Sequence, residues 1–522
     1  MKSRFLMCFT AITLLVALAM PLRFAAQDKK DHNQDHHYKL IDLGTFGGPT
    51  GWLCNDQTFG GDACPVLNSR GTVVSGADTF LPNPNYGNPS IFLPPTGSPP
   101  GDPFIQHAFQ WQGGVLQDLG TLPGGYNSTA FAISKNGLVA GASETGAMDP
   151  LLGVPAADAV LWKNGKIIDL GPIEGGYESA AIAVNDRGQA AGYGLNTVPD
   201  NFWFFSTQAR AFFWQNGAIQ DLGTLGTGTD AFAFFINDRG QIAGASFANT
   251  TVNPVLTACT LFQLPIPTQD PFLWENGKMT DLGTFGGTCG LPNAMNNRGQ
   301  VVGQSDLAGD ASFHAFVWTS PGPMQDLGTL GGSNSAASWI NDAEDVVGSA
   351  DISPTAYHAF LWRHGVMTDL GTLGSGSGPC SGALGINSNR QVVGSSGDCL
   401  LDQTSHAFLW ENGQITDLNI FNHPGSGLQQ LMLGYNVNDR GEIDGLGVPP
   451  GVNPADVFTL GHVFALIPCE GNDDGCQGGG GENAVPQTNP ASSDVLSRKP
   501  LQSLMRGMNR YHFPDPAFGP RN

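Results

Sequence analysis

The stretch SAASWINDAEDVVGSADISPTAYHAFLWRHGVMTDLG, residues 335–371, decides the fold of this chain. Its apolar segments are too short for a helix that buries one face, and each is bounded by Asn, Asp or Gly. These features predict four β-strands. We name the strands in chain order: A (Ser335–Asn341), B (Val346–Gly348), C (His358–Trp362) and D (Val366–Gly371).

The connections between these segments predict antiparallel hairpins. Asn-Gly pairs such as Asn164-Gly165 and Asn276-Gly277 separate strand C from strand D, and Asn-Gly is the preferred filling of a two-residue type I′ turn. The segment Asn237–Gly240 and its relatives fit a slightly longer hairpin between A and B, with Gly supplying a positive φ. Each unit is therefore expected to be a four-stranded antiparallel sheet.

The same unit recurs along the chain. The D-strand triplet Asp-Leu-Gly, or a close variant, begins at Asp42, Asp118, Asp169, Asp221, Asp281, Asp326, Asp369 and Asp417. The interval between triplets drifts between 43 and 76 residues, which indicates a constant unit with loops of variable length. His, Trp and Asp recur with the unit, so we expect them to pack and to form hydrogen bonds, because a catalytic position is used once.

The repeated motif resembles the HAF repeat, a family of bacterial extracellular repeats. The resemblance rests on His-Ala-Phe-x-Trp at His107, His314, His358 and His406, followed by a turn and Asp-Leu-Gly, and it covers residues 38–468. Asp158, Arg210 and Asp270 stand where His is expected, and Asn419 replaces the last Gly. The resemblance implies export and repetition, and no established activity.

The order of the strands predicts a closed ring. The first strand, Tyr38–Gly44, is of type D and the last, His462–Pro468, is of type C. An open array has no reason to begin with a fourth strand and end with a third, whereas a ring lets the first strand complete the last sheet. The expected fold is an all-β, eight-bladed β-propeller of four-stranded antiparallel blades, closed by pairing the N-terminal strand with the three C-terminal strands.

Composition and termini limit the class of protein. The 522 residues include 45 acidic and 23 basic side chains, a net charge of -22, which disfavours nucleic acid and anionic lipid as partners. Residues 1–26 read as a cleaved signal peptide, 27–37 as a polar linker, 38–468 as the propeller and 469–522 as a low-complexity, disordered tail. We expect an extracellular or periplasmic monomer without a membrane insertion after cleavage.

The cysteines are expected to form disulfides. An even set remains after signal cleavage, at Cys54, Cys64, Cys259, Cys289, Cys380, Cys399, Cys469 and Cys476. We expect the pairs Cys54–Cys64, Cys259–Cys289, Cys380–Cys399 and Cys469–Cys476, although eight cysteines allow many connectivities. No metal or cofactor is expected, because the chain has no Cys-x-x-Cys, phosphate loop or His-Glu-x-x-His.

The long loops are expected to share one face. Antiparallel connections alternate between strand ends, so the A–B and C–D turns share one face, here called the turn face, and the B–C and D–A connections share the other, the loop face. Every long insertion falls on the loop face. These insertions are residues 45–64, 77–106, 142–157, 193–208 and 245–269.

Candidate functional residues were sought among those that do not repeat. Trp52 and Trp203 fall in long loops and Trp339 on an A strand facing the channel, where they either bind ligand by stacking or pack the loops onto the blades. Five carboxyl groups in D–A connections are either solvated surface acids or a source of a general acid and base for glycoside cleavage. They are Asp56, Asp62, Glu174, Glu178 and Asp230.

Two functions remain open from the sequence. The favoured interpretation is an exported non-catalytic protein whose loop face binds carbohydrate or an extracellular protein as a binding or scaffold module. The alternative is a secreted propeller hydrolase or lyase acting on polysaccharide. The two differ in whether carboxyl groups converge at the loop face or lie scattered.

Overall fold

The computed structural model describes the repeated part of the chain. The described residues are 37–53, 65–90, 102–173, 175–200, 207–253, 266–374, 378–399, 404–469 and 476. The chain divides into two compact units, Met1–His37 and Tyr38–Asn522, and of the first only His37 is described. The predicted signal peptide, most of the linker and nearly all of the tail therefore lie outside the described residues.

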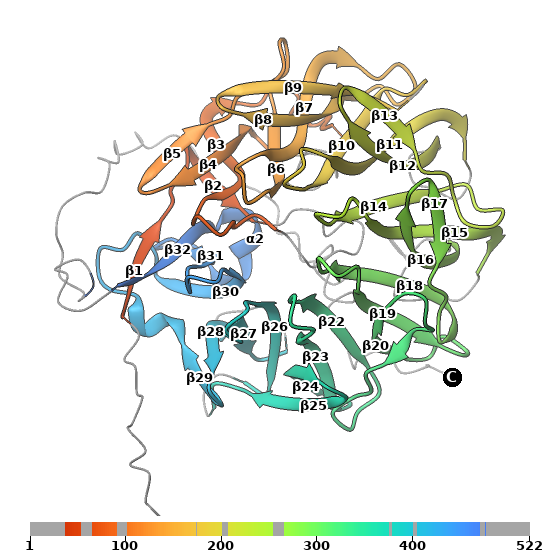
Figure 1. Ribbon diagram of the computed structural model, residues 1–522. Coiled ribbons are helices and arrows are strands. Elements are labelled where there is room, and N and C mark those ends of the chain that lie inside the picture. Colours follow the sequence, from red (N-terminus) through yellow and green to blue (C-terminus); the bar gives the residue numbers. More distant parts are fainter. Residues whose placement is uncertain are drawn as a thin grey trace, which may run out of the picture. The chain divides into compact units, whose positions relative to one another are not determined.

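The described part is an all-β structure of antiparallel sheets (Figure 1). Sheet I contains β2 (Gly47–Trp52), β3 (Val73–Pro82), β4 (Phe104–Gln112) and β5 (Val115–Asp118). Sheet II contains β6 (Ser128–Ile133), β7 (Val139–Met148), β8 (Pro155–Lys163) and β9 (Lys166–Gly171). Sheet III contains β10 (Glu178–Val184), β11 (Ala190–Pro199), β12 (Thr207–Gln215) and β13 (Ala218–Asp221).

Sheets IV and V are two halves of one eight-stranded sheet, joined by a single parallel bridge between Gln269 and Cys289. Sheet IV contains β14 (Ala231–Ile236), β15 (Ile242–Val252), β16 (Pro267–Glu275) and β17 (Lys278–Asp281). Sheet V contains β18 (Gly286–Met295), β19 (Val301–Leu307), β20 (Phe313–Trp318) and β21 (Gln325–Asp326).

The remaining sheets again contain four strands each. Sheet VI contains β22 (Ser335–Ile340), β23 (Val346–Ser353), β24 (Ala356–Arg363) and β25 (Val366–Gly371). Sheet VII contains β26 (Cys380–Ile386), β27 (Val392–Gly397), β28 (His406–Glu411) and β29 (Gln414–Asp417). Sheet VIII contains β30 (Gln430–Val437), β31 (Ile443–Val448), β32 (His462–Cys469) and β1 (His37–Asp42). Short helices η2 (Leu418–Phe421), η3 (Pro454–Asp456) and α2 (Val457–Leu460) lie in connections around sheet VIII.

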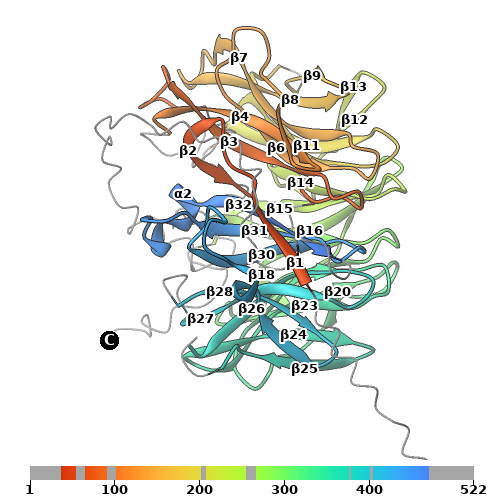
Figure 2. The ribbon, with the colours of Figure 1, turned by 90° about the vertical axis from the view of Figure 1, so that its left-hand side faces the viewer.

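Sheet VIII joins the first described strand to the last. Its order is β1-β32-β31-β30, and both views place β1, in red, beside β32, in blue (Figures 1 and 2). The Leu43 amide donates to the Val463 carbonyl over 2.9 Å, and His462 Nδ1 lies 3.0 Å from an Asp42 carboxylate oxygen. The expected pairing of the N-terminal strand with the three C-terminal strands is therefore present.

Hydrogen bonding explains the Asp-Leu-Gly triplet. The Asp carboxylate accepts the backbone N–H two residues later in all eight triplets, over 2.7–2.9 Å. In seven triplets the third residue is Gly with φ between 71° and 82°, a conformation that favours glycine, whereas Asn419 makes the same contact at the start of η2 without a positive φ. The triplet therefore ends strand D with a fixed change of chain direction.

The HAF histidines pair with the same aspartates. Nδ1 of the C-strand His lies 2.6–3.0 Å from the D-strand carboxylate at His107, His314, His358, His406 and His462. Arg210 replaces the His in sheet III and contacts Asp221 over 3.0 Å. The contact recurs with the fold, as expected of a structural pair.

Asparagines at the A–B turns tie each sheet to the next. Their Nδ2 groups donate over 2.9–3.3 Å to the carbonyl at the equivalent turn of the following sheet. The donors are Asn68, Asn185, Asn237, Asn296, Asn341, Asn387 and Asn438. In sheet II the turn holds Ser134, and Asn136 contacts Asp186 of sheet III instead. The last donor, Asn438, returns to the Asn68 carbonyl of sheet I.

The core and the loop face follow from strand length and packing. The C-strand Phe is fully buried in most sheets, as at Phe109, Phe212, Phe272, Phe316, Phe360, Phe408 and Phe464. The B strands of sheets I to IV are 10 or 11 residues long, whereas those of sheets V to VIII have 6 to 8. The first four sheets therefore extend further at the loop face. No helix in the described ranges is long and apolar enough to cross a membrane.

Candidate functional site

One buried position at the start of the A strands makes the same contact in sheet after sheet. Its side chain accepts a backbone N–H from strand C of the preceding sheet, over 2.7–3.5 Å. We call it the acceptor position, and it is occupied by Asn127, Glu178, Asp230, Asn334 and Cys380. Because neutral Asn suffices for this contact, the fold does not require an acid there.

Two sheets nevertheless carry an acid at the acceptor position. Glu178 and Asp230 both have 0% exposure, and burying a carboxyl group is costly unless it is well partnered. In sheets II and VI the acceptor Asn donates to an acid on strand B, as Asn127 does to Glu144 over 2.8 Å. In sheet III the residue paired with Glu178 in register is the apolar Leu195. Glu178 therefore lies opposite an apolar residue, whereas the strand-B acids of sheets II and VI each accept a hydrogen bond from an asparagine side chain.

Glu178 lies among further carboxyl groups. Burial raises its pKa well above the ordinary value, and the charges of Asp149, Asp158 and Glu144 raise it further, against one hydrogen bond from the Ala157 amide that lowers it. That bond is 3.2 Å long and goes to Oε2, while the buried Oε1 has no hydrogen-bond partner. Both effects favour the protonated form of the Glu178 carboxyl group.

Glu144 and Asp149 are held by N–H donors. Glu144 accepts from the Tyr126 amide over 3.0 Å and from the Asn85 side chain, which reaches across from the β3–β4 connection of sheet I. Asp149, in the β7–β8 connection, accepts the amides of Leu151 and Leu152. The site thus combines Glu178, whose Oε1 has no hydrogen-bond partner, with two acids that accept several N–H groups.

A second carboxyl pair occupies the corresponding place in the next sheets. Burial raises the pKa of Asp230 to about 7, and a hydrogen bond and charge from Asp200 add to this, against bonds from Thr229 and Ala209 that lower it. Asp200 follows β11 as Asp149 follows β7, and both are at most 5% exposed. Asp149 with Glu178 and Asp200 with Asp230 therefore form equivalent pairs between neighbouring sheets.

Asp158 contributes where the repeat usually carries His. Burial, followed by the charge of Asp169 and a hydrogen bond to it, raises the pKa of Asp158 to about 7. The equivalent Asp270 in sheet IV shows the same effect beside Asp281, with a pKa of about 6. The departures from the HAF motif thus create acid pairs in place of His–Asp pairs.

Only some of the site residues predicted from the sequence are described by the structure. Glu178 and Asp230 belong to the carboxyl pairs, whereas Asp56, Asp62, Glu174 and Trp203 lie outside the described residues. Trp52 is only 4% exposed, and Trp339 is half-buried against the core between sheets VI and VII. Their role in ligand binding stays a prediction.

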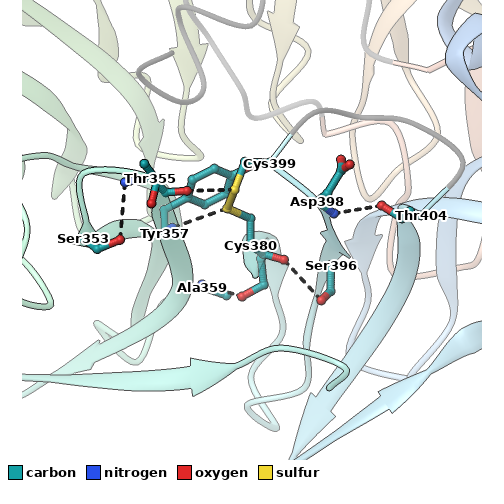
Figure 3. The surroundings of a disulfide bond; sticks show 10 residues. Ser353, Thr355, Tyr357, Ala359, Cys380, Ser396, Asp398, Cys399 and Thr404 are labelled. Atoms are coloured by element: carbon teal, nitrogen blue, oxygen red, sulfur yellow. Dashed lines mark hydrogen bonds between the residues drawn. A yellow bond between two sulfur atoms is a disulfide. The ribbon is translucent and has the colours of Figure 1, made fainter. Parts of the chain in front are cut away.

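The described cysteines are disulfide-bonded. Cys380 is bonded to Cys399 and Cys469 to Cys476, with Cα–Cα distances of 5.1 and 5.7 Å. Figure 3 shows Cys380, at the acceptor position, facing the Tyr357 amide while bonded to Cys399. Cys289 is bonded too, and its expected partner Cys259 lies outside the described residues, as do Cys54 and Cys64.

Several site residues were not singled out from the sequence. Asp149 and Glu144 belong to no motif, and Asp158 stood out only as a departure from His. Tyr126 and Tyr177, each directly before the acceptor position, are 46% and 41% exposed.

Among the described residues no group of three or more His, Cys, Asp or Glu has a geometry that could hold a metal ion.

Comparison with known proteins gives similarity to solved structures alone. No family model matches the chain, and no curated protein matches it. Pyrococcus horikoshii acylaminoacyl peptidase is 10% identical with a TM-score of 0.36, covering 77% of this chain and 60% of that one. Porphyromonas gingivalis dipeptidyl peptidase 4 is 8% identical with a TM-score of 0.37, covering 67% and 55%. The chain thus spans little more than half the length of these two peptidases.

A third similar structure is the β-propeller domain of the Trilobed protease from Pyrococcus furiosus, which is 10% identical with a TM-score of 0.24 and covers 56% of this chain and 96% of that one. At such identities the likeness concerns the fold alone. One expectation is corrected: the similar structures include an acylaminoacyl peptidase, a dipeptidyl peptidase, a gluconolactonase and prolyl endopeptidases, which favours the catalytic alternative over the non-catalytic binding or scaffold module.

Proposed function

We propose that this protein is an exported β-propeller hydrolase that cleaves polysaccharide, with Glu178 as the proton donor. The support for catalysis is the chemistry of the carboxyl groups around Glu178, since the activities of the similar structures are those of other proteins. Glycoside hydrolysis needs a protonated carboxyl group beside a second, ionised one.

The observation that carries the proposal is the acid at the acceptor position of sheet III. The equivalent Asn127 and Asn334 make the same backbone contact without charge. Glu178 instead retains an unpartnered oxygen and a raised pKa among three further acids. Groups that hold a proton near neutral pH at the expense of stability are typical of catalytic acids.

Asp149 is proposed as the second carboxyl group, because the equivalent Asp200 pairs with Asp230 in the next sheets. Glu178 donates its proton to the glycosidic oxygen as the bond to the anomeric carbon breaks. A water molecule adds to that carbon and gives its proton to the Asp149 carboxylate. The products are a sugar hemiacetal and the released alcohol. Because Glu178 is buried, substrate binding must displace the chain around Tyr177.

The fold proposed for this enzyme is the closed eight-bladed propeller of HAF-type repeats. It is supported by the pairing of β1 with β32 and by the asparagine contacts that return from Asn438 to Asn68. A closed ring would hold the β7–β8 and β9–β10 connections at fixed positions on the loop face. Rigid support of this kind positions the carboxyl groups of the site.

Export is proposed from the predicted signal peptide and is supported by the disulfides. Cys380–Cys399 and Cys469–Cys476 are the kind of bond that forms and persists in oxidising compartments. A polysaccharide outside the cell would be within reach of such an enzyme.

The test is hydrolysis of a panel of polysaccharides by the wild type and by Glu178→Gln. Glutamine keeps an oxygen that accepts the Ala157 amide but has no acidic proton, so we expect a folded protein whose turnover falls at least 100-fold. Asp444→Asn is the matched control, because Asp444 is a buried acid with a pKa of about 7 in sheet VIII. Full activity of Glu178→Gln, or equal loss in both variants, would contradict the proposal.

A further inference from the structure

Most of the positive charge of the repeat array lies at one face. Residues 38–468 contain thirteen Lys and Arg, and eleven of them lie in A–B or C–D turns of the turn face or at the strand ends beside those turns. These eleven are Arg70, Lys135, Lys163, Lys166, Arg187, Arg239, Lys278, Arg298, Arg363, Arg390 and Arg440. Many contact acids of the same face, as Arg298 does with Glu344 and Lys135 with Asp238. The turn face is therefore of mixed charge.

The other two cations lie within strands D and C. Lys39 begins strand D and so lies at its turn-face end. Arg210 is bound to Asp221 over 3.0 Å and to the Thr229 carbonyl over 3.2 Å. The B–C and D–A connections between residues 38 and 468 contain no Lys or Arg, including their undescribed parts.

The loop face carries acids instead. In sheets II and III these include Glu144, Asp149, Asp158 and Glu178, and Asp200 and Asp230 follow in sheets III and IV. All are at most 9% exposed, so the negative charge of those that are ionised acts in surroundings where solvent screens little. Burial and then the charges of Asp149, Asp158 and Glu144 raise the pKa of Glu178.

Two exposed tyrosines lie beside this group of acids. Tyr126 and Tyr177 occupy the same place in the repeat, directly before Asn127 and Glu178, and the Tyr126 amide donates to Glu144. The equivalent residues of the following sheets are Thr229, Thr288 and Ser333, so the aromatic pair is confined to the two sheets around Glu178. Exposed phenol rings next to carboxyl groups attract both sugar faces and cations.

We propose that the substrate is a polysaccharide carrying free amino groups, held by Tyr126 and Tyr177 over the carboxyl groups around Glu178. This inference rests on the proposed function for the choice of a sugar polymer. Protonated amines are attracted by a face whose connections contain no Lys or Arg and whose nearby Arg210 is paired with Asp221, whereas a uronate polymer is repelled by it. The same argument disfavours the lyase alternative, because elimination from a polysaccharide proceeds beside a uronate carboxylate.

Binding to the Glu178→Gln variant tests the inference without cleavage. The ligands are a glucosamine hexamer, its fully N-acetylated form, a galacturonate hexamer and hexalysine, measured by calorimetry at low and high salt. We expect the glucosamine hexamer to bind at least tenfold more tightly than the N-acetylated and galacturonate hexamers, and to weaken with salt. Tyr126→Ala and Tyr177→Ala, at exposed positions, should each weaken its binding about tenfold, and Tyr→Phe should preserve it.

The outcomes separate the inference from the proposed function. Equal or tighter binding of the N-acetylated or galacturonate hexamer overturns the inference, and hexalysine binding as tightly as the glucosamine hexamer shows that the face selects cationic peptides instead. Binding of the glucosamine hexamer that is unchanged in both Tyr126→Ala and Tyr177→Ala also overturns the inference. Selective binding of the glucosamine hexamer without cleavage by the wild type upholds the ligand class and overturns the hydrolase.

Discussion

Replacing Asp230 by Asn should stabilise the protein at neutral and alkaline pH. Asp230 is fully buried, and its folded pKa of about 7 lies above the ordinary 3.8. A raised folded pKa means that the contribution to stability is complete below about pH 4, declines as pH rises and is lost above about pH 7. At about 1.4 kcal/mol per pH unit, roughly 3 units correspond to ~4 kcal/mol as an upper limit.

Asparagine at this position can accept the Ala209 amide, as Asn127 accepts the Gln106 amide, so the variant avoids the buried charge and keeps the contact. Urea unfolding at about pH 4 and pH 8 should give similar free energies of unfolding at the lower pH and a more stable variant at the higher. Asn127→Asp is the reverse control, since it places a second acid beside Glu144 and should lose stability at pH 8. An Asp230→Asn variant that is less stable than the wild type at pH 8 would refute this reasoning.

Two further predictions concern the repeat and the disulfides. Asp369→Ala removes the hydrogen bonds that Asp369 forms with the Gly371 amide and His358. It should therefore lower the free energy of unfolding by about 1–2 kcal/mol and leave turnover on polysaccharide unchanged. Loss of turnover without loss of stability would show that the repeated His–Asp pair is functional. Replacing Cys380 and Cys399 together by Ser should lower the free energy of unfolding by about 3 kcal/mol, measured by urea unfolding under non-reducing conditions. An unchanged midpoint of urea unfolding would show that the disulfide adds nothing to stability.

The sequence was most informative where the repeat is regular. The Asn-Gly turns, the Asp-Leu-Gly triplets and the order of strand types predicted four-stranded antiparallel sheets and the pairing of the first strand, expected at Tyr38–Gly44, with the last. This pairing is present through β1, His37–Asp42. These features could be predicted because each depends on local chemistry, such as a positive φ or an Asx turn, that is repeated in every unit.

The candidate site was harder to predict from the sequence than the fold. Glu178 and Asp230 were named for their place in D–A connections, but their burial depends on strands from two sheets and no motif shows it. Asp149 and Glu144 approach Glu178 from another sheet, so their spacing along the chain gives no signal. Trp52 was expected in a long loop and instead belongs to β2, where it is 4% exposed.

The central claim, that Glu178 holds a proton at neutral pH, is tested most directly by the infrared difference spectrum between the wild type and Glu178→Gln. The account predicts that the wild type at about pH 7 shows the carbonyl band of a protonated, weakly hydrogen-bonded carboxyl group that the variant lacks. The difference should shift to carboxylate bands as the pH is raised. Carboxylate bands alone at neutral pH would contradict the account.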